Sequence, residues 1–472
     1  MIAPVERVIL TGADLTLDQL LAVARRGAQV EISPDALAAM ARARDVADRA
    51  LGDGRPAYGV STGVGSRKLF DIAKRDHDRL LVRQHRISQG KPVPHEVVRG
   101  SALRLANALA RATTVARPEL AEILVAAVND DRLPVVRALG SIGQSDLAQM
   151  ADLADGVLGD LELVQGEAIT LLNQSAFATA YGALAFADAK VLLDVLDHAG
   201  ALDLEALAGN RDSVHPAVGV ARPYPGLQAT LARIGALLEG SEVESRSLQD
   251  PLTFRTIAQQ NGSCRDAFAF VEQQLSIELN AAQSNPLVVV DEDRVFSVGN
   301  FEMQPLATAL DVARLALAPT ISTAAERTVK LLQKNLTGLT HGLGEKPDMP
   351  ESALSEYGIA VQAIAVEARL LAQPVSFDLV STTQAEGIED RMTMAPLAAR
   401  RLEEMAELGA RVVAVELMHA AQACDLRAER LGAGTARLHA AVRRFVPFLE
   451  EGAALPDLEP LVQEIRSGRI IE

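Results

Sequence analysis

The stretch Gly140-Ser141-Ile142-Gly143-Gln144-Ser145-Asp146-Leu147-Ala148 lies between two segments of different character. An extended run, Leu133-Pro134-Val135-Val136, precedes it, and an apolar run with helical spacing begins near Leu147. Glycine lets a backbone bend where other residues resist, and Ser145 places a hydroxyl group within this bend. The stretch therefore predicts an active-site loop held by a mainly helical scaffold.

The composition is that of a globular protein with a large core. The chain has 472 residues, of which 49% are hydrophobic and 23% are charged. Its net charge of −16 and the lack of a basic stripe argue against a nucleic-acid partner or an anionic membrane. The N-terminus lacks the pattern of a signal peptide, and the longest apolar runs carry regular charges, so we expect a cytoplasmic protein without a membrane span.

Two cysteines, Cys264 and Cys424, lie in apolar stretches with helical spacing. A disulfide is one interpretation, but buried free thiols in a reducing compartment are favoured. The eight histidines show no metal-ligand spacing, so we expect no metal.

Hydrophobic spacing predicts a mainly α fold. Strand-like pieces at residues 7–10 and 29–32 precede a helix whose start is marked by Ser33 as the cap and Pro34 in the first turn. Further helical runs are predicted at residues 147–164, 167–200, 262–282, 303–335, 353–372, 396–427 and 434–449, with residues 203–256 irregular. We predict a bundle of long helices, divided into an N-terminal part (1–200) with the glycine-rich loops and a part (201–472) with the central bundle and C-terminal helices.

Seven motifs follow one another along nearly the whole chain. They are Ala57 to Gly65 (AYGVSTGVG), Leu81 to His85 (LVRQH), Leu171 to Ser175 (LLNQS), Gln249 to Arg255 (QDPLTFR), Asn280 to Leu287, Gly299 to Phe301 (GNF) and Glu389 to Met394 (EDRMTM). Each motif is weak alone. Together and in this order they resemble the aromatic amino acid lyase family, which contains histidine, tyrosine and phenylalanine ammonia-lyases and the related aminomutases.

The resemblance implies a homotetramer of long helices, with active sites built from loops of several subunits around a small anionic substrate. It implies that Tyr58 acts as acid/base, that Glu389 is the active-site glutamate and that Arg255 clamps the substrate carboxylate. The other substrate-binding residues that it implies are His85, Asn173, Gln249, Leu252 and Phe301. Tyr58 as a packed loop aromatic and Arg255 as a structural ion pair are the alternative interpretations. A phenol has a pKa of about 10, so a base role needs positive charge or backbone dipoles nearby.

The family's electrophile is the 4-methylideneimidazol-5-one (MIO) group, which forms from Ala-Ser-Gly by cyclisation and loss of two waters. The glycine is unhindered and bends into a strained turn. Here the segment reads Gln144-Ser145-Asp146, and no glycine follows Ser145. We therefore expect the MIO group to be absent and no cofactor to be present. Ser145 is then either an unmodified catalytic residue or, with Asp146, a helix N-cap, and the N-cap is favoured.

Three further positions depart from the family pattern. Leu252 stands in place of the second catalytic tyrosine, Glu302 where histidine often follows Asn-Phe, and Arg391 in place of the histidine after Glu-Asp. The leading hypothesis is an MIO-independent, lyase-like enzyme of secondary metabolism. It would use tyrosine acid/base chemistry on a small carboxylate or amino-acid-derived substrate for β-elimination, conjugate addition, isomerisation or cyclisation. The alternatives are a conventional ammonia-lyase with an unusual tripeptide and a non-catalytic binding or assembly partner.

Overall fold

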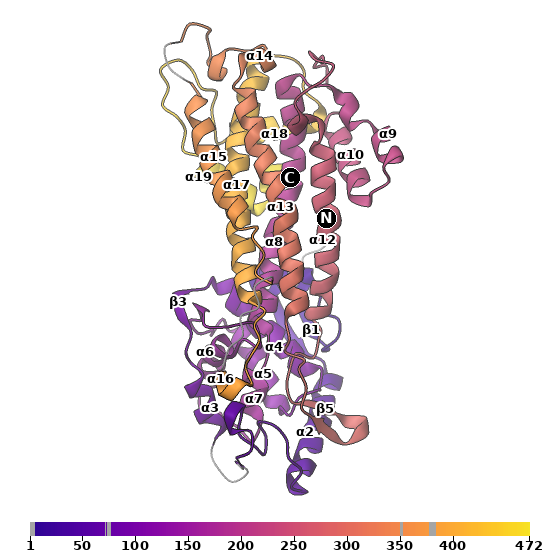
Figure 1. Ribbon diagram of the computed structural model, residues 1–472, viewed down its shortest axis with the longest axis vertical. Coiled ribbons are helices and arrows are strands. Elements are labelled where there is room, and N and C mark those ends of the chain that lie inside the picture. The colour runs from indigo at the N-terminus through magenta and orange to yellow at the C-terminus, as the bar shows by residue number, and fades with distance from the viewer. Residues whose placement is uncertain (1–4, 71, 73–76, 350–352, 377–383) are drawn as a thin grey trace. The chain divides into compact units, whose positions relative to one another are not determined.

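The computed structural model describes residues 5–70, 72, 77–349, 353–376 and 384–472, and it is mainly helical (Figure 1). The predicted fold class is confirmed. The shorter helices of the first half are α1 (Leu17–Arg26), α2 (Pro34–Gly52), α3 (Asp78–Gln84), α4 (His95–Ala110), α5 (Pro118–Asn129), α6 (Leu147–Leu158) and α7 (Glu167–Leu172). The long helices are α8 (Ala176–Leu207), α12 (Ile257–Glu278), α13 (Gln304–Leu331) and α17 (Ala395–Arg427).

Shorter helices lie between and after the long ones. They are α9 (Pro216–Ala221), α10 (Pro225–Leu237), α11 (Leu252–Arg255), α14 (Lys334–Thr337), α15 (Ser355–Leu370), α16 (Gln384–Gly387), α18 (Ala433–Arg443) and α19 (Glu459–Ser467). Residues 203–256 are thus less irregular than predicted. Pro216 and Pro225 occupy the first turns of α9 and α10, where a missing backbone N–H costs nothing, so here proline starts helices.

The strands of the described residues form three two-stranded sheets. β1 (Arg7–Leu10) pairs in parallel with β2 (Gln29–Ile32), and both match the predicted ranges. β3 (Gln89–Pro92) pairs with β4 (Arg137–Leu139), and β5 (Leu287–Val289) pairs with β6 (Arg294–Phe296), both antiparallel. β4 ends one residue before Gly140, so the β3–β4 pair fixes the entry to the candidate loop.

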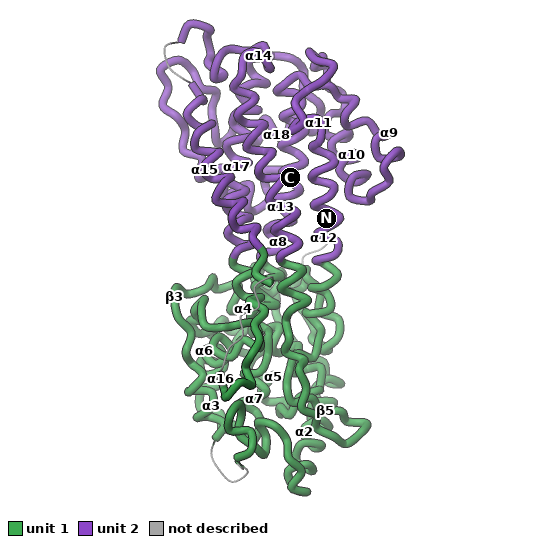
Figure 2. Tube along the Cα trace, viewed as in Figure 1, with its two compact units in different colours: residues 1–184, 272–310, 374–400 green, residues 185–271, 311–373, 401–472 purple. Residues whose placement is uncertain are grey.

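The chain divides into two compact units that interleave in sequence (Figure 2). Unit 1 contains residues 1–184, 272–310 and 374–400, and unit 2 contains residues 185–271, 311–373 and 401–472. The sequence-based boundary at residue 200 stays a prediction.

In unit 2, small residues let the long helices pack closely. A Cβ atom added at Gly409 of α17 would lie 2.4 Å from a methyl group of Leu192 on α8 and 2.9 Å from one of Ile321 on α13. In Figure 1, α8, α13 and α17 run side by side in this unit. The predicted apolar face of α12 is confirmed, because Cys264, Phe268, Val271, Leu275 and Leu279 are all buried. Both cysteines are free and buried, as predicted.

Among the described residues, one stretch, Glu167–Leu207, is apolar and long enough to cross a membrane by composition alone. Its most apolar window is 83% buried inside the protein, as in a core helix. In this part of the chain, the two helices predicted at residues 147–164 and 167–200 are interrupted earlier than expected. α6 ends at Leu158 because Gly159 takes a positive φ of 53°, and residues 173–175 separate α7 from α8.

Candidate active site

The candidate loop carries its serine in a strained conformation. Ser145 has a φ of 64°, in the left-handed region that non-glycine residues avoid, and its side chain is buried. Its hydroxyl group donates a short hydrogen bond to Oδ1 of Asn173, and the Nδ2 group of Asn173 donates to the backbone oxygen of Asn285 at 3.0 Å. The structure thus brings together Ser145 and Asn173, two of the predicted site residues.

A second segment fixes the other side of the loop. The backbone N–H groups of Thr393 and Met394 both donate to the oxygen of Ile142 at 3.0 Å. The hydroxyl of Thr393 donates to the backbone oxygen of Gly143 at 2.7 Å. Gly143 has a φ of 78°, and a Cβ atom there would lie 2.1 Å from that hydroxyl, so a larger residue does not fit.

Asp146 follows Ser145 and is fully buried. Its carboxylate accepts hydrogen bonds from the backbone N–H of Ala178 (2.8 Å) and the hydroxyl of Ser141 (2.7 Å). Burial raises the pKa of Asp146 to about 6, against these two hydrogen bonds. α6 begins at Leu147, as predicted, and Asp146 occupies the N-cap position, but its side chain makes no capping hydrogen bond. The side chain instead ties the loop to the start of α8.

The tyrosine loop is a tight turn in the same unit. The N–H groups of Val60, Ser61 and Thr62 all donate to the backbone oxygen of Ala57. The phenol oxygen of Tyr58 accepts a hydrogen bond from the backbone N–H of Gly65 at 2.9 Å. Burial and the nearby carboxylate of Glu389 raise the pKa of Tyr58, while the Gly65 hydrogen bond acts in the opposite direction. Tyr58 and Glu389 are therefore close enough to couple electrostatically.

The helix α7 links the two loops. Its residue Ile169 lies under the tyrosine loop, where a Cβ atom added to Gly59 would come within 2.8 Å of it. Its C-terminal end leads directly into Asn173. One short helix thus sets the positions of both Tyr58 and the partner of Ser145.

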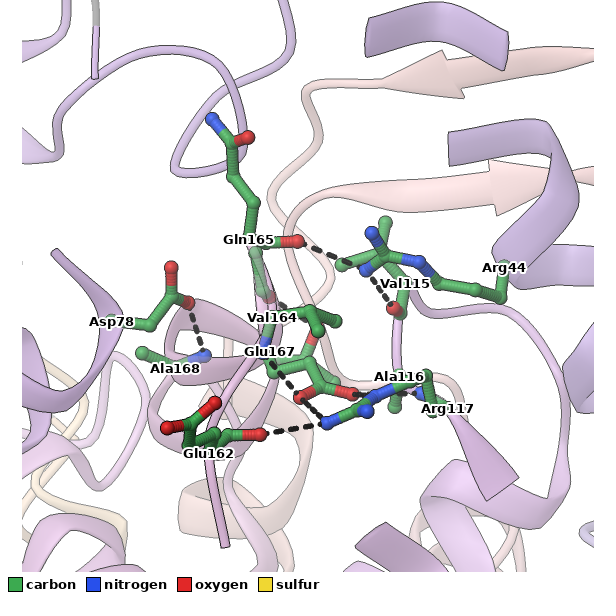
Figure 3. Close-up of polar contacts among 12 residues, drawn as sticks. Arg44, Asp78, Val115, Ala116, Arg117, Glu162, Val164, Gln165, Glu167 and Ala168 are labelled. Carbon is green, nitrogen blue, oxygen red and sulfur yellow. Dashed lines mark hydrogen bonds and ion pairs between the residues drawn. The ribbon is translucent and has the colours of Figure 1, made fainter. Parts of the chain in front are cut away.

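Figure 3 shows how the beginning of α7 is anchored. Glu167 is fully buried and accepts both arms of the Arg117 guanidinium group, at 2.8 and 2.9 Å, and the backbone N–H of Val164 at 2.9 Å. Asp78 of α3 accepts the backbone N–H of Ala168 at 2.8 Å, and burial raises its pKa to about 6. Sequence reasoning missed this anchor, since no local pattern joins Arg117 to Glu167.

The remaining predicted residues of unit 1 have clear places. His85 caps the end of α3, is half-buried, and its Nδ1 atom bonds to the backbone oxygen of Leu81 at 2.8 Å. The backbone oxygen of Phe301 accepts from the hydroxyl of Ser175 at 3.3 Å. Glu389 is half-buried, and burial followed by the charge of Asp390 raises its pKa.

Three predicted residues belong to unit 2. Leu252 and Gln249 are exposed, and Leu252 is the first residue of α11. Arg255 ends α11, where its Nε atom donates to the backbone oxygen of Asp250 at 2.7 Å. This contact holds the guanidinium group at one edge, and both interpretations of Arg255, as carboxylate clamp and as structural ion pair, stay predictions.

The structure also connects Glu302 and Arg391, which the sequence presented as separate departures, with Gln144 of the candidate loop. The Nε2 group of Gln144 donates to Oε2 of Glu302 at 2.7 Å, and the Nε group of Arg391 donates to the same oxygen at 2.9 Å. We call these residues the Glu302 cluster. Within the described residues, no group of three or more histidine, cysteine or acidic side chains could hold a metal ion.

The fold and this arrangement of loops define the class of the protein. A family profile described as aromatic amino acid lyase matches residues 15–444, and the chain belongs to that family. It is an enzyme of the lyase and aminomutase fold, and a small-molecule substrate fits this membership.

Particular relatives narrow the class. The chain is 35% identical to the histidine ammonia-lyase of Deinococcus radiodurans, over 97% of this chain and 93% of that protein. It is 34% identical to the histidine ammonia-lyase of Symbiobacterium thermophilum, over 98% and 97%. Among solved structures, the ergothioneine-degrading ergothionase of Treponema denticola matches with a TM-score of 0.93 and 26% identity over 99% of this chain and 100% of that one. Histidine ammonia-lyase from Trypanosoma cruzi matches with a TM-score of 0.89 and 28% identity over 98% and 94%.

These comparisons correct two sequence predictions. The leading hypothesis of an MIO-independent enzyme is wrong, because relatives that match nearly the whole chain are histidine ammonia-lyases. That finding supports the conventional ammonia-lyase, which was the alternative. The same relatives imply an MIO group, which contradicts the prediction of no cofactor. The sequence argument rested on the missing glycine and on Leu252 in place of the second catalytic tyrosine. In the structure, Ser145 itself adopts a left-handed turn of the kind that the glycine was expected to provide.

The precursor of the group in this chain would be Gln144-Ser145-Asp146. The buried hydroxyl of Ser145 and the strained turn fit the group. The ring would join the backbone nitrogen of Asp146 to the carbonyl carbon of Gln144. That nitrogen now donates to the oxygen of Gln174 at 2.8 Å, and this hydrogen bond would have to break. Asp146 carries a side chain where the family tripeptide ends in an unhindered glycine, and Gln144 stands where that tripeptide begins with alanine.

Proposed function

We propose that this enzyme eliminates ammonia from an aromatic α-amino acid, with L-histidine as the first candidate. The observation that carries the proposal is the likeness, over nearly the whole chain, to curated histidine ammonia-lyases at 31–35% identity. The product would be the corresponding propenoic acid. In the elimination, a proton leaves the β-carbon, and the electron pair of the broken C–H bond forms the new double bond between the α- and β-carbons. The bond from the α-carbon to nitrogen breaks, and its electron pair leaves with the nitrogen.

In this proposal Tyr58 accepts the β-proton at its phenol oxygen. The N–H of Gly65 points at that oxygen and stabilises the phenolate. Burial and Glu389 raise the pKa of Tyr58, so the reactive phenolate is scarce at neutral pH. Activity should therefore increase with pH towards the raised pKa of Tyr58. Arg255 would bind the substrate carboxylate as a planar bidentate donor. When formed, the MIO group supplies the electrophile that makes the amino group a better leaving group.

The test uses the purified chain and two variants. The wild type should release ammonia from L-histidine, and its intact mass should be lower by two waters than the sequence mass. Tyr58→Phe should keep the mass deficit of two waters relative to its own sequence mass and lose about 10²- to 10⁴-fold in kcat, the usual contribution of a general base. Ser145→Ala should lose both the mass change and the activity. An unmodified wild-type mass, or full activity in Tyr58→Phe, would contradict the proposal.

A second candidate substrate is a histidine betaine such as ergothioneine. The observation that favours it is the structural likeness to ergothionase over the full length of both chains. In a betaine the nitrogen is already quaternary, so it leaves as a neutral amine when the β-proton is removed. Incubation with ergothioneine beside L-histidine, with trimethylamine and ammonia measured separately, distinguishes the two substrates.

We also propose that the enzyme is a cytoplasmic homotetramer whose sites combine loops of several subunits. The support is the family membership. Light scattering of the purified protein tests the tetramer. If Arg255 acts across subunits, mixing inactive Tyr58→Phe and Arg255→Met proteins should restore part of the activity. A role in secondary metabolism stays a prediction.

A further inference from the structure

The Glu302 cluster is built around the carboxylate of Glu302, and both oxygens of this carboxylate accept hydrogen bonds. Oε2 of Glu302 accepts from Gln144 at 2.7 Å and from Arg391 at 2.9 Å, while Oε1 accepts from the backbone N–H of Gln304 at 2.9 Å. Residues 144 and 302 also form an isolated antiparallel β-bridge. Arg391 uses a second arm to donate to Oε1 of Gln304 at 3.1 Å.

The three side chains depend on one another. Burial alone would raise the pKa of Glu302, but hydrogen bonds from Arg391, Gln144 and Gln304 outweigh it and hold that pKa below its ordinary value. Without Arg391, the carboxylate would lose its positive partner, and without Glu302, the amide of the buried Gln144 would lose its acceptor.

The cluster acts on the residue next to the serine. Gln144 is only 9% exposed, so its side chain has few alternative positions, and its peptide bond leads directly into the strained Ser145. A left-handed serine is strained and persists only where its surroundings hold it. Asn173 holds the Ser145 side chain, and Thr393 holds the backbone at Gly143. The Gln144 side chain is held by Glu302.

We propose that Glu302 is a positioning residue that acts through Gln144 to fix the backbone at Ser145 for the reaction. The proposal rests on the proposed function for its kinetic consequence, although the fixing of the loop can be measured without it. Arg391 supports Glu302 as its counter-charge. None of the three side chains is proposed to touch the reacting atoms.

A double-mutant cycle with Glu302→Gln and Gln144→Ala tests this role. Hydrogen exchange of the amides of residues 141–144 and steady-state kinetics are measured for the wild type, both single variants and the double variant. Glu302→Gln should speed exchange at these amides by about tenfold, as expected for the loss of one charge-assisted hydrogen bond. It should lower kcat by a similar factor with little change in KM, because the substrate contacts remain.

The double variant shows whether Glu302 acts through Gln144. If Glu302 acts through Gln144, Glu302→Gln has no additional effect once Gln144 is alanine. Independent effects that multiply, or unchanged exchange at residues 141–144, would overturn the proposal. The matched control is Glu96→Gln, which weakens a partly exposed bidentate ion pair with Arg25 in the same unit and should leave exchange at 141–144 unchanged. If the wild type acts on no imidazole amino acid, the proposed function fails, while the exchange cycle still decides the positioning role.

Discussion

Two clusters pair an arginine with carboxylates at very different depths in the protein. In unit 2, Arg327 of α13 donates to Asp203 at 2.6 Å and to Glu416 at 2.5 and 2.9 Å, and all three side chains are at most 1% exposed. In unit 1, the side chains of Arg391 and Glu302 are 43% and 34% exposed. The first cluster joins long helices, and the second borders a reactive loop.

The difference in burial means that the Arg327 cluster stabilises the fold, whereas the Glu302 cluster serves the candidate active site. Removing one partner from a fully buried ion pair leaves a buried charge without its counter-charge, so a substitution in the buried cluster strongly destabilises the fold. Burial and the neighbouring Glu416 raise the pKa of Asp203 well above its ordinary value, against the opposing charge of Arg327. The exposed pair is screened by water and contributes little to stability. Such a pair can change with the chemistry of the site without unfolding the protein.

The largest expected effect is on the buried cluster. Arg327→Met should lower the free energy of unfolding by about 3–5 kcal/mol, because two buried acids lose their shared cation. Urea denaturation measures the change. The control is Arg411→Met on α17, whose exposed pairs with Glu407 and Glu459 should be worth about 1 kcal/mol or less. Equal effects of the two variants would show that depth does not set the cost.

Asp146 provides a buried carboxylate whose hydrogen-bond donors are uncharged. Its pKa in the folded state is about 6, above the value of about 3.9 expected when unfolded. The folded state therefore binds the proton more tightly, and the stability from this group is complete below pH 4 and is lost as the pH rises through 6. Relative to Asp146→Asn, the wild type should lose up to about 3 kcal/mol between pH 4 and 7. Urea denaturation of both proteins across this range tests it, and parallel pH curves would contradict it.

A smaller effect is expected at the exposed pair. Arg391→Met should change the free energy of unfolding by about 1 kcal/mol or less, since water takes over the solvation of Glu302. The same denaturation measurement applies. A loss as large as that of Arg327→Met would mean that the Glu302 cluster belongs to the folding core.

Salt gives the smallest and most selective test. At about 1 M salt the screening length falls to about 3 Å, so the stability difference between the wild type and Arg391→Met should vanish. The difference for Arg327→Met should remain, because ions do not enter the buried cluster. An Arg391→Met effect that is insensitive to salt would point to packing of the side chain in place of charge.

Much of the fold could be predicted because the start of a helix and its buried face depend on residues that are close together in the sequence. The spacing of apolar residues gave the face of α12, and Ser33 with Pro34 gave the start of α2, where the Ser33 hydroxyl accepts the N–H of Ala36 at 3.1 Å. The break between α7 and α8 was not predicted, because the contacts that hold Asn173 to Ser145 and Asn285 come from distant segments. The position of Tyr58 in a turn followed from its glycines, but its Gly65 hydrogen bond did not.

The sequence by itself determined the mainly helical fold, the family and the identity of most candidate residues, since these depend on short motifs in a fixed order. Only the tertiary structure decided what surrounds Ser145. Gln144 and Glu302 are 158 positions apart in the chain, and the Arg391–Glu302 pair spans 89. No periodicity connects such positions, because their contact arises from the packing of separate segments. The similarity to histidine ammonia-lyases then corrected the prediction that the MIO group is absent. In the structure, Ser145 itself adopts the left-handed backbone conformation.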